Sequence, residues 1–253
     1  MVKGIKDFEF QNDCVNFLIQ KTVARDSKKV ITVKAPTGAG KSVMFQVPAI
    51  YLAEKYNLLT IVISPLIGLM NDQVKNLELK NYQHAKTINS DISPIIKQDI
   101  IDKVAEGQYD ILYISPETLL SRSDVEQLIG DRTIGMIVID EAHMYRGSSG
   151  GEVSLLIRRV LHKLGIDRNK VQFILTSASI PSAPAEQEKV KKFACDLSAQ
   201  AFENNTFKLI TGKTEPITHT QFTFDPTIFA DYDIDELQKD WALQLVKICE
   251  KLY

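Results

Sequence analysis

Val30-Ile-Thr-Val-Lys-Ala-Pro-Thr-Gly-Ala-Gly-Lys-Ser42 is the stretch of this chain that decides its fold. Residues 30–34 are mostly β-branched and indicate a buried strand, and the glycine-rich residues 35–42 follow directly. Gly38 and Gly40 allow the backbone to curl so that successive N–H groups face one anion, at the positive end of the helix expected next. Strand, loop and helix together favour a phosphate-binding loop over a chance glycine-rich turn.

The side chains of this loop suit a nucleoside triphosphate and its magnesium ion. Lys41 is placed to reach the β- and γ-phosphates, and the Ser42 hydroxyl to bind Mg²⁺. Ala35 stands where the usual pattern has its first glycine. The predicted nucleotide contacts in the loop are Thr37, Gly38, Ala39, Gly40, Lys41 and Ser42.

A second polar string, Asp140-Glu-Ala-His143, follows the fully apolar run 134–139. An unpaired carboxylate at the end of such a strand is costly to bury, so we expect Asp140 to serve Mg²⁺. Glu141 is then placed to orient or deprotonate the attacking water. A solvated acidic turn fits poorly, because the preceding strand has no polar face. For His143 the sequence leaves open a bond to residues 176–179, a role toward the γ-phosphate, or a structural hydrogen bond alone.

A third string, Thr176-Ser-Ala-Ser179, follows the apolar run 171–175 and predicts a polar turn that connects the nucleotide site to another part of the protein. Residues 58–63 and 110–114 are also mostly apolar, and each run is followed by Ser-Pro. Near-continuous apolar runs are typical of strands covered on both faces, as in a parallel α/β sheet. Ligands of such sheets gather at the carboxyl ends of the strands, where all these strings fall.

Upstream of the loop, Phe8-Glu-Phe-Gln11 precedes an amphipathic stretch. The Gln11 amide has the geometry to pair with the exposed edges of adenine, and a nearby phenylalanine such as Phe8 can stack on the ring. From these residues alone, a solvated glutamine at an ordinary helix start is the simpler interpretation.

Composition narrows the function less than the motifs do. The 253 residues carry a formal net charge of −2, so charge does not indicate nucleic-acid binding as a strongly basic domain would. Such a chain can still bind a nucleic-acid strand through backbone amides and hydroxyls. No apolar run approaches the roughly 20 residues of a membrane span, and the first residues lack the apolar stretch of a secretory signal. We therefore expect a cytoplasmic protein with no membrane partner.

Taken together, these strings resemble the first RecA-like motor domain of a superfamily 2 helicase of the DEAD/DEAH-box kind. Residues 8–11 are similar to its adenine-reading Q motif, 35–42 to motif I, 140–143 to motif II and 176–179 to motif III, which couples the sites. Residues 64–74 and 115–119 resemble motifs Ia and Ib of RecQ-like enzymes. The resemblance implies contacts to the sugar-phosphate backbone of a single strand, and helix capping is the alternative role. These residues are Ser64, Pro65, Leu66, Ser115, Pro116 and Glu117.

The resemblance implies an α/β P-loop domain over residues 1–200, with 201–253 ending that domain and leading toward a second RecA-like domain. It also implies ATP and Mg²⁺ as cofactors, and 3′-to-5′ movement on DNA bound as a single strand or at a junction with duplex. Residues 144–153 carry one aromatic and three glycines in place of the RecQ aromatic-rich loop, and they look more like YprA-type helicases. Nothing resembles motifs IV to VI, so we expect poor activity from this chain alone. A nucleotide-switched nucleic-acid-binding module and an RNA helicase are the alternatives.

Overall fold

A computed structural model describes residues 5–23, 30–36, 38–121, 125–181, 183–202 and 206–212. The chain divides into two units, residues 1–213 and 214–253, and every described residue lies in the first. The amphipathic helix that the sequence predicts from Ile234 onward lies outside the described residues. The boundary near residue 200 stays a prediction.

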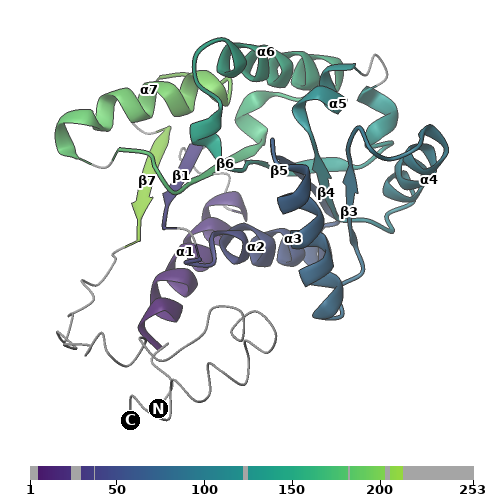
Figure 1. Cartoon of the computed structure of the whole chain (residues 1–253), viewed down its shortest axis with the longest axis horizontal. Helices are drawn as coiled ribbons and strands as arrows, with labels where there is room; N and C mark the ends of the chain where they lie inside the picture. Colours follow the sequence, from purple (N-terminus) through teal and green to yellow (C-terminus); the bar gives the residue numbers. More distant parts are fainter. Residues whose placement is uncertain are drawn as a thin grey trace, which may run out of the picture. The chain divides into compact units, whose positions relative to one another are not determined.

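Helices and strands alternate along almost the whole of the first unit (Figure 1). The strands are β1 Val30–Lys34, β2 Leu58–Ile63, β3 Ala85–Ile88, β4 Ile111–Ile114, β5 Thr133–Ile139, β6 Gln172–Ser177 and β7 Phe207–Thr211. The α-helices are α1 Ile5–Val23, α2 Lys41–Tyr56, α3 Ile67–Leu79, α4 Pro94–Ala105, α5 Pro116–Ser121, α6 Gly147–Lys163 and α7 Gln187–Leu197. Short 3-10 turns cover Val125–Leu128, Ala142–Met144, Arg168–Lys170 and Pro184–Glu186.

The strands form one seven-stranded sheet in the order β3-β4-β2-β5-β6-β1-β7. Every pairing in it is parallel, which confirms the predicted α/β class. Five strands match the apolar runs of the sequence. The strands β3 and β7 were missed, because Ala85–Ile88 is only four residues long and Phe207–Thr211 is half-buried or exposed throughout.

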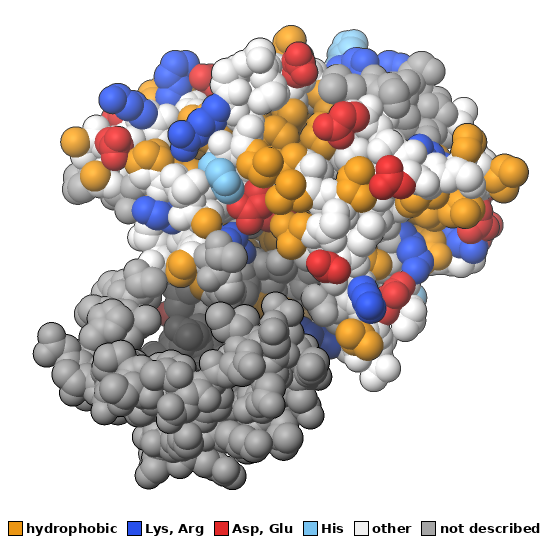
Figure 2. All heavy atoms as spheres, viewed as in Figure 1, with side chains coloured by type: hydrophobic (Ala, Val, Ile, Leu, Met, Phe, Trp, Pro, Cys, Tyr) orange, Lys and Arg blue, Asp and Glu red, His pale blue; other side chains and the backbone are white. Residues whose placement is uncertain are grey.

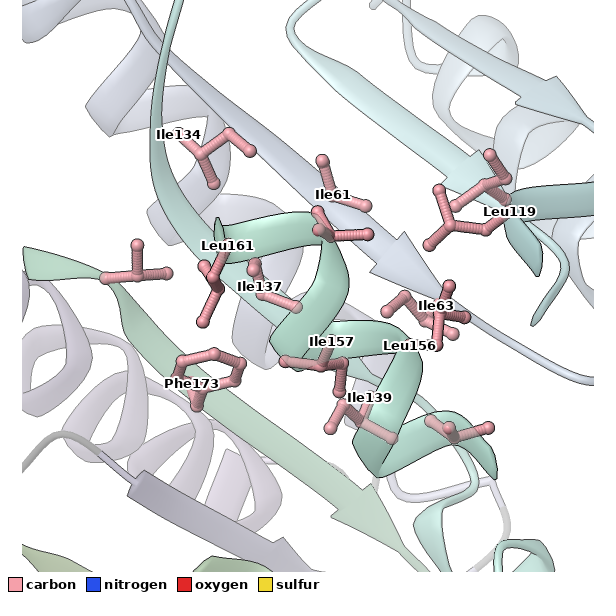
Figure 3. Close-up of a cluster of buried hydrophobic side chains, with 14 of the residues drawn as sticks. Ile61, Ile63, Leu119, Ile134, Ile137, Ile139, Leu156, Ile157, Leu161 and Phe173 are labelled. Carbon is pink, nitrogen blue, oxygen red and sulfur yellow. The ribbon is translucent and has the colours of Figure 1, made fainter. Parts of the chain in front are cut away.

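Two hydrophobic cores cover the two faces of the sheet, and neighbouring strand residues alternate between them. In β2, Ile61 and Ile63 face the core formed with α4 to α7, while Val62 faces the core formed with α1 to α3. Figure 3 shows the first core, with Leu156, Ile157 and Leu161 of α6 packed over strand isoleucines. Burial on both faces explains why these strands have no polar side.

Parallel pairing brings the predicted strings to one edge. Lys34 of β1 is in register with Ser177 of β6, and Ile63 of β2 with Ile139 of β5. The loops that follow β1, β2, β5 and β6 therefore begin side by side. Within the part of the chain that the structure describes, no helix has the length and apolar character needed to cross a membrane.

Candidate functional site

The glycine-rich loop curls through two left-handed glycines before α2 begins. Gly38 has φ +83° and Gly40, at the start of α2, has φ +68°, a region that glycine enters without steric cost. The Ala39 amide donates to Pro36 O at 3.2 Å, and the Val43 amide donates to Gly40 O at 3.1 Å. The loop therefore has the tight shape that a phosphate cradle needs, with Ser42 in the first turn of α2. Thr37 lies outside the described residues.

Gln11 reaches this loop from α1. Its Nε2 donates to Ala39 O at 3.0 Å, and its side chain is half-buried. The interpretation of Gln11 as a purely solvated residue is therefore wrong. Residues 8–11 lie inside α1 rather than before its helical stretch, and of Phe8 the structure describes the backbone only.

Lys41 and Glu141 form an ion pair at the carboxyl ends of the strands. The Lys41 ammonium lies 3.7 Å from Glu141 Oε1 and 3.5 Å from Pro36 O, and the Lys41 side chain is only 9% exposed. Glu141 itself has φ +48°, a left-handed conformation that costs a non-glycine residue about 1–2 kcal/mol. Such strain, held by the surrounding fold, is typical of functional positions. The short turn after β5 thus directs a carboxylate toward the lysine of the phosphate loop.

Asp140 is 2% exposed and is held from two sides. The Thr176 hydroxyl donates to Oδ1, and Gln73 Nε2 donates to Oδ2 at 3.0 Å. Both donors are neutral, and none of the described cationic side chains forms an ion pair with Asp140. A buried carboxylate without a cationic partner is costly, and each of its oxygens keeps a further lone pair. This environment of Asp140 fits a carboxylate that serves a divalent cation.

His143 bridges the second and third strings. Its Nδ1 lies 3.1 Å from Ser177 Oγ and 3.3 Å from Glu141 Oε2, so the predicted bond to residues 176–179 is present. The third string is not a turn as a whole, because Thr176 and Ser177 end β6 and are fully buried. Ser177 Oγ also accepts the Ser179 amide at 3.2 Å, and Ala178 lies half-buried between them. A strand end therefore links the acidic string to the segment that follows.

The two Ser-Pro strings follow neighbouring strands. The Ser64 amide donates to Ile114 O at 3.3 Å, at the end of the strand that Ser115 follows. Ser115 Oγ lies 2.9 Å from Thr118 Oγ1 and accepts the Thr118 amide at 3.4 Å, which is a helix cap of α5.

The first Ser-Pro string differs, because α3 starts after Leu66 with no side-chain cap. Ser64 Oγ is buried and has no hydrogen-bond partner in the described residues. Leu66 and Glu117 are exposed, while Pro116 is buried and Pro65 half-buried.

Two residues at this edge escaped the sequence analysis as site residues. Gln73 lies on the buried face of α3 with Met70, Val74 and Leu77. A polar residue within that apolar spacing is the sequence signal by which it could have been found. Tyr145 is 4% exposed, and burial raises the pKa of its hydroxyl, with the charges of Glu117 and Asp140 adding to the effect. Arg146 is exposed at the start of α6.

The fold and this edge define a RecA-like P-loop domain, with a phosphate loop on one strand and an acidic string two strands away. Residues 9–187 match the model of the DEAD/DEAH box helicase family, so the chain belongs to that family.

The names of similar proteins are consistent with this family. The chain is 32% identical over 189 residues to the ATP-dependent DNA helicase RecQ of Bacillus subtilis, an alignment covering 71% of this chain and 30% of that protein. It is 41% identical over 113 residues to RecQ of Synechocystis sp., covering 44% of this chain and 22% of the relative. The chain thus spans less than a third of either relative.

Among solved structures, the chain is similar to the DUF1998 helicase MrfA bound to DNA and AMPPNP. The TM-score is 0.60 at 23% identity, covering 82% of this chain and 27% of MrfA. At this identity the likeness concerns the fold.

Proposed function

We propose that this chain is the ATP-binding motor domain of an ATP-dependent DNA helicase or translocase. The observation that carries the proposal is the meeting of Lys41, Asp140 and Glu141 at one strand edge, with Lys41 Nζ 3.7 Å from Glu141 Oε1. A lysine for phosphate, a buried carboxylate for metal and a carboxylate for water are the groups that phosphoryl transfer uses. The family and the DNA-helicase names of the relatives support the same function.

Each group at the edge has a role in this proposal. Residues 37–42 bind the phosphates through backbone N–H groups and Lys41, while Gln11 and Phe8 bind adenine. Ser42 and Asp140 hold Mg²⁺, which neutralises phosphate charge when bound. Glu141 orients the water that attacks the γ-phosphate. His143 and residues 176–179 connect this site to strand binding, since His143 Nδ1 already lies 3.1 Å from Ser177 Oγ.

The DNA strand is proposed to lie along residues 64–66 and 115–117, which follow the neighbouring strands β2 and β4. On the face in Figure 2, Lys and Arg side chains are interspersed with Asp and Glu. With a net charge of −2, electrostatic attraction to phosphates is weak. We therefore propose that a second RecA-like domain completes the strand site. That domain also supplies an arginine finger, worth about three to five orders of magnitude in rate.

Steady-state ATP hydrolysis tests this proposal, with and without single-stranded DNA, on this chain and on a longer one with a second motor domain. We expect Mg-ATP binding by both and DNA-stimulated turnover by the longer one alone. Robust DNA-stimulated turnover by the 253 residues alone would refute the need for a second domain. Stimulation by RNA in place of DNA would make the protein an RNA helicase. Binding without turnover in the longer chain would make it a nucleotide-switched module.

A further inference from the structure

Gln73 forms a hydrogen bond with the buried carboxylate of Asp140. Its Nε2 donates to Asp140 Oδ2 at 3.0 Å, although 67 residues separate the two in sequence. Both side chains are buried, at 5% and 2% exposure. Such a contact is shielded from competing water, so it fixes the orientation of the carboxylate more firmly than a surface hydrogen bond does.

The chemistry of the two groups sets the direction of this bond. An ionised carboxylate accepts hydrogen bonds only, so the amide must present its NH₂ group rather than its oxygen. Gln73 Oε1 is consequently left buried without a hydrogen-bond partner in the described residues. An unsatisfied buried oxygen has a free-energy cost, and this cost accompanies the donation of the amide NH₂ group to Asp140.

Gln73 and Thr176 hold the carboxylate from different elements. Thr176, on β6, donates to Oδ1, while Gln73, on α3, donates to Oδ2. Together they fix the rotation of the carboxylate plane and add no positive charge that would compete with a cation. The helix that carries Gln73 begins immediately after the proposed strand contacts Ser64, Pro65 and Leu66.

We propose that Gln73 is a positioning residue for the magnesium site, holding Asp140 in the orientation that metal binding requires. This inference rests on the proposed function, in which Asp140 serves Mg²⁺. Partners of metal-binding groups that do not touch the metal typically change metal affinity by about 10- to 100-fold when removed.

Calorimetry of ATP binding, in EDTA and in saturating Mg²⁺, tests the proposal without any need for turnover. The quantity compared is the factor by which Mg²⁺ improves ATP affinity. We expect Gln73→Met, similar in size but without the donor, to reduce this factor by about 10-fold and to leave ATP binding in EDTA unchanged. Should Gln73→Met not fold, Gln73→Asn, one methylene too short to reach Asp140, is measured instead with the same expected result.

Gln46→Met is the matched control. Gln46 is also buried, at 6% exposure, but its Nε2 donates to the Tyr113 hydroxyl at 2.9 Å and not to Asp140. In Gln46→Met, we expect Mg²⁺ to improve ATP affinity by the same factor as in the unmutated chain. If Mg²⁺ improves the ATP affinity of Gln73→Met and Gln46→Met by equal factors, the proposal is overturned.

A double variant separates positioning from general damage. In an Asp140→Asn background, Gln73→Met is expected to cause no further loss, because Gln73 acts through Asp140. An equal additional loss in that background would also overturn the positioning role. If ATP affinity of the unmutated chain does not respond to Mg²⁺ at all, the proposed metal site itself fails. A normal response that Gln73→Met leaves intact refutes only this inference.

Discussion

Replacing Gly40 by alanine tests how the phosphate loop and α1 fit together. Gly40 has φ +68°, and a Cβ built on it would lie within 3.0 Å of Gln11 Nε2. Gly38 provides a matched control, because it has φ +83° and nothing within 4 Å of its Cβ position. Both substitutions impose the left-handed backbone on alanine, but only Gly40→Ala displaces the Gln11 amide.

The magnitudes follow from these two geometries. A left-handed conformation costs alanine about 1–2 kcal/mol at either position. Gly40→Ala also breaks the 3.0 Å bond from Gln11 Nε2 to Ala39 O, a further cost of about 0.5–1.5 kcal/mol. Because Gln11 Nε2 is the end of a flexible side chain, it moves aside and the additional cost stays at this level. For a chain of this size the difference corresponds to about 1–6 °C in melting temperature.

Urea unfolding followed by circular dichroism measures these free energies for Gly38→Ala, Gly40→Ala and each in a Gln11→Ala background. We expect Gly40→Ala to be more destabilising than Gly38→Ala in the unmutated chain. The two should become equal once Gln11 is removed, because the clash and the hydrogen bond disappear together. Equal destabilisation at both glycines in the unmutated chain would show that Gln11 does not pack against this loop.

Three further predictions concern the nucleotide. Lys41→Ala should weaken Mg-ATP binding strongly, because it removes the ammonium that faces the phosphates, and an unchanged dissociation constant by calorimetry would exclude this site. ATP should bind better than GTP, and Gln11→Ala should reduce that preference by about 1–3 kcal/mol, by analogy with amide–adenine pairs at DNA. Equal affinity of the unmutated chain for ATP and GTP would count against adenine recognition by Gln11. In a two-domain enzyme, Glu141→Gln should keep ATP binding and lose turnover, whereas Asp140→Asn should weaken the magnesium dependence. Identical effects of these two variants on binding and turnover would mean that their roles are wrongly assigned.

Sequence patterns located the strands that are buried on both faces, because burial of that kind demands an unbroken apolar run. Residues 58–63 and 134–139 were recognisable for this reason, and so was the class of the sheet. The edge strand β7 carries no such run, since all of its residues are half-buried or exposed, and pairing with β1 alone makes it a strand. The end of β6 was also predicted wrongly, as part of a turn. Polar Thr176 and Ser177 lie within the strand, and their burial is compensated by hydrogen bonds to Asp140 and His143 that the sequence does not reveal.

The sequence by itself determined which chemical groups stand after the strands, because residue type alone decides whether a side chain could bind a phosphate, a metal or a water. The roles predicted for Lys41, Asp140 and Glu141 rest on this. Only the tertiary structure decided which neighbours hold those groups. The bond of Gln73 to Asp140 joins residues 67 positions apart, and that of Gln11 to Ala39 joins residues 28 apart. Local patterns carry no information on such pairs, because strand order and helix packing bring them together only when the whole domain folds.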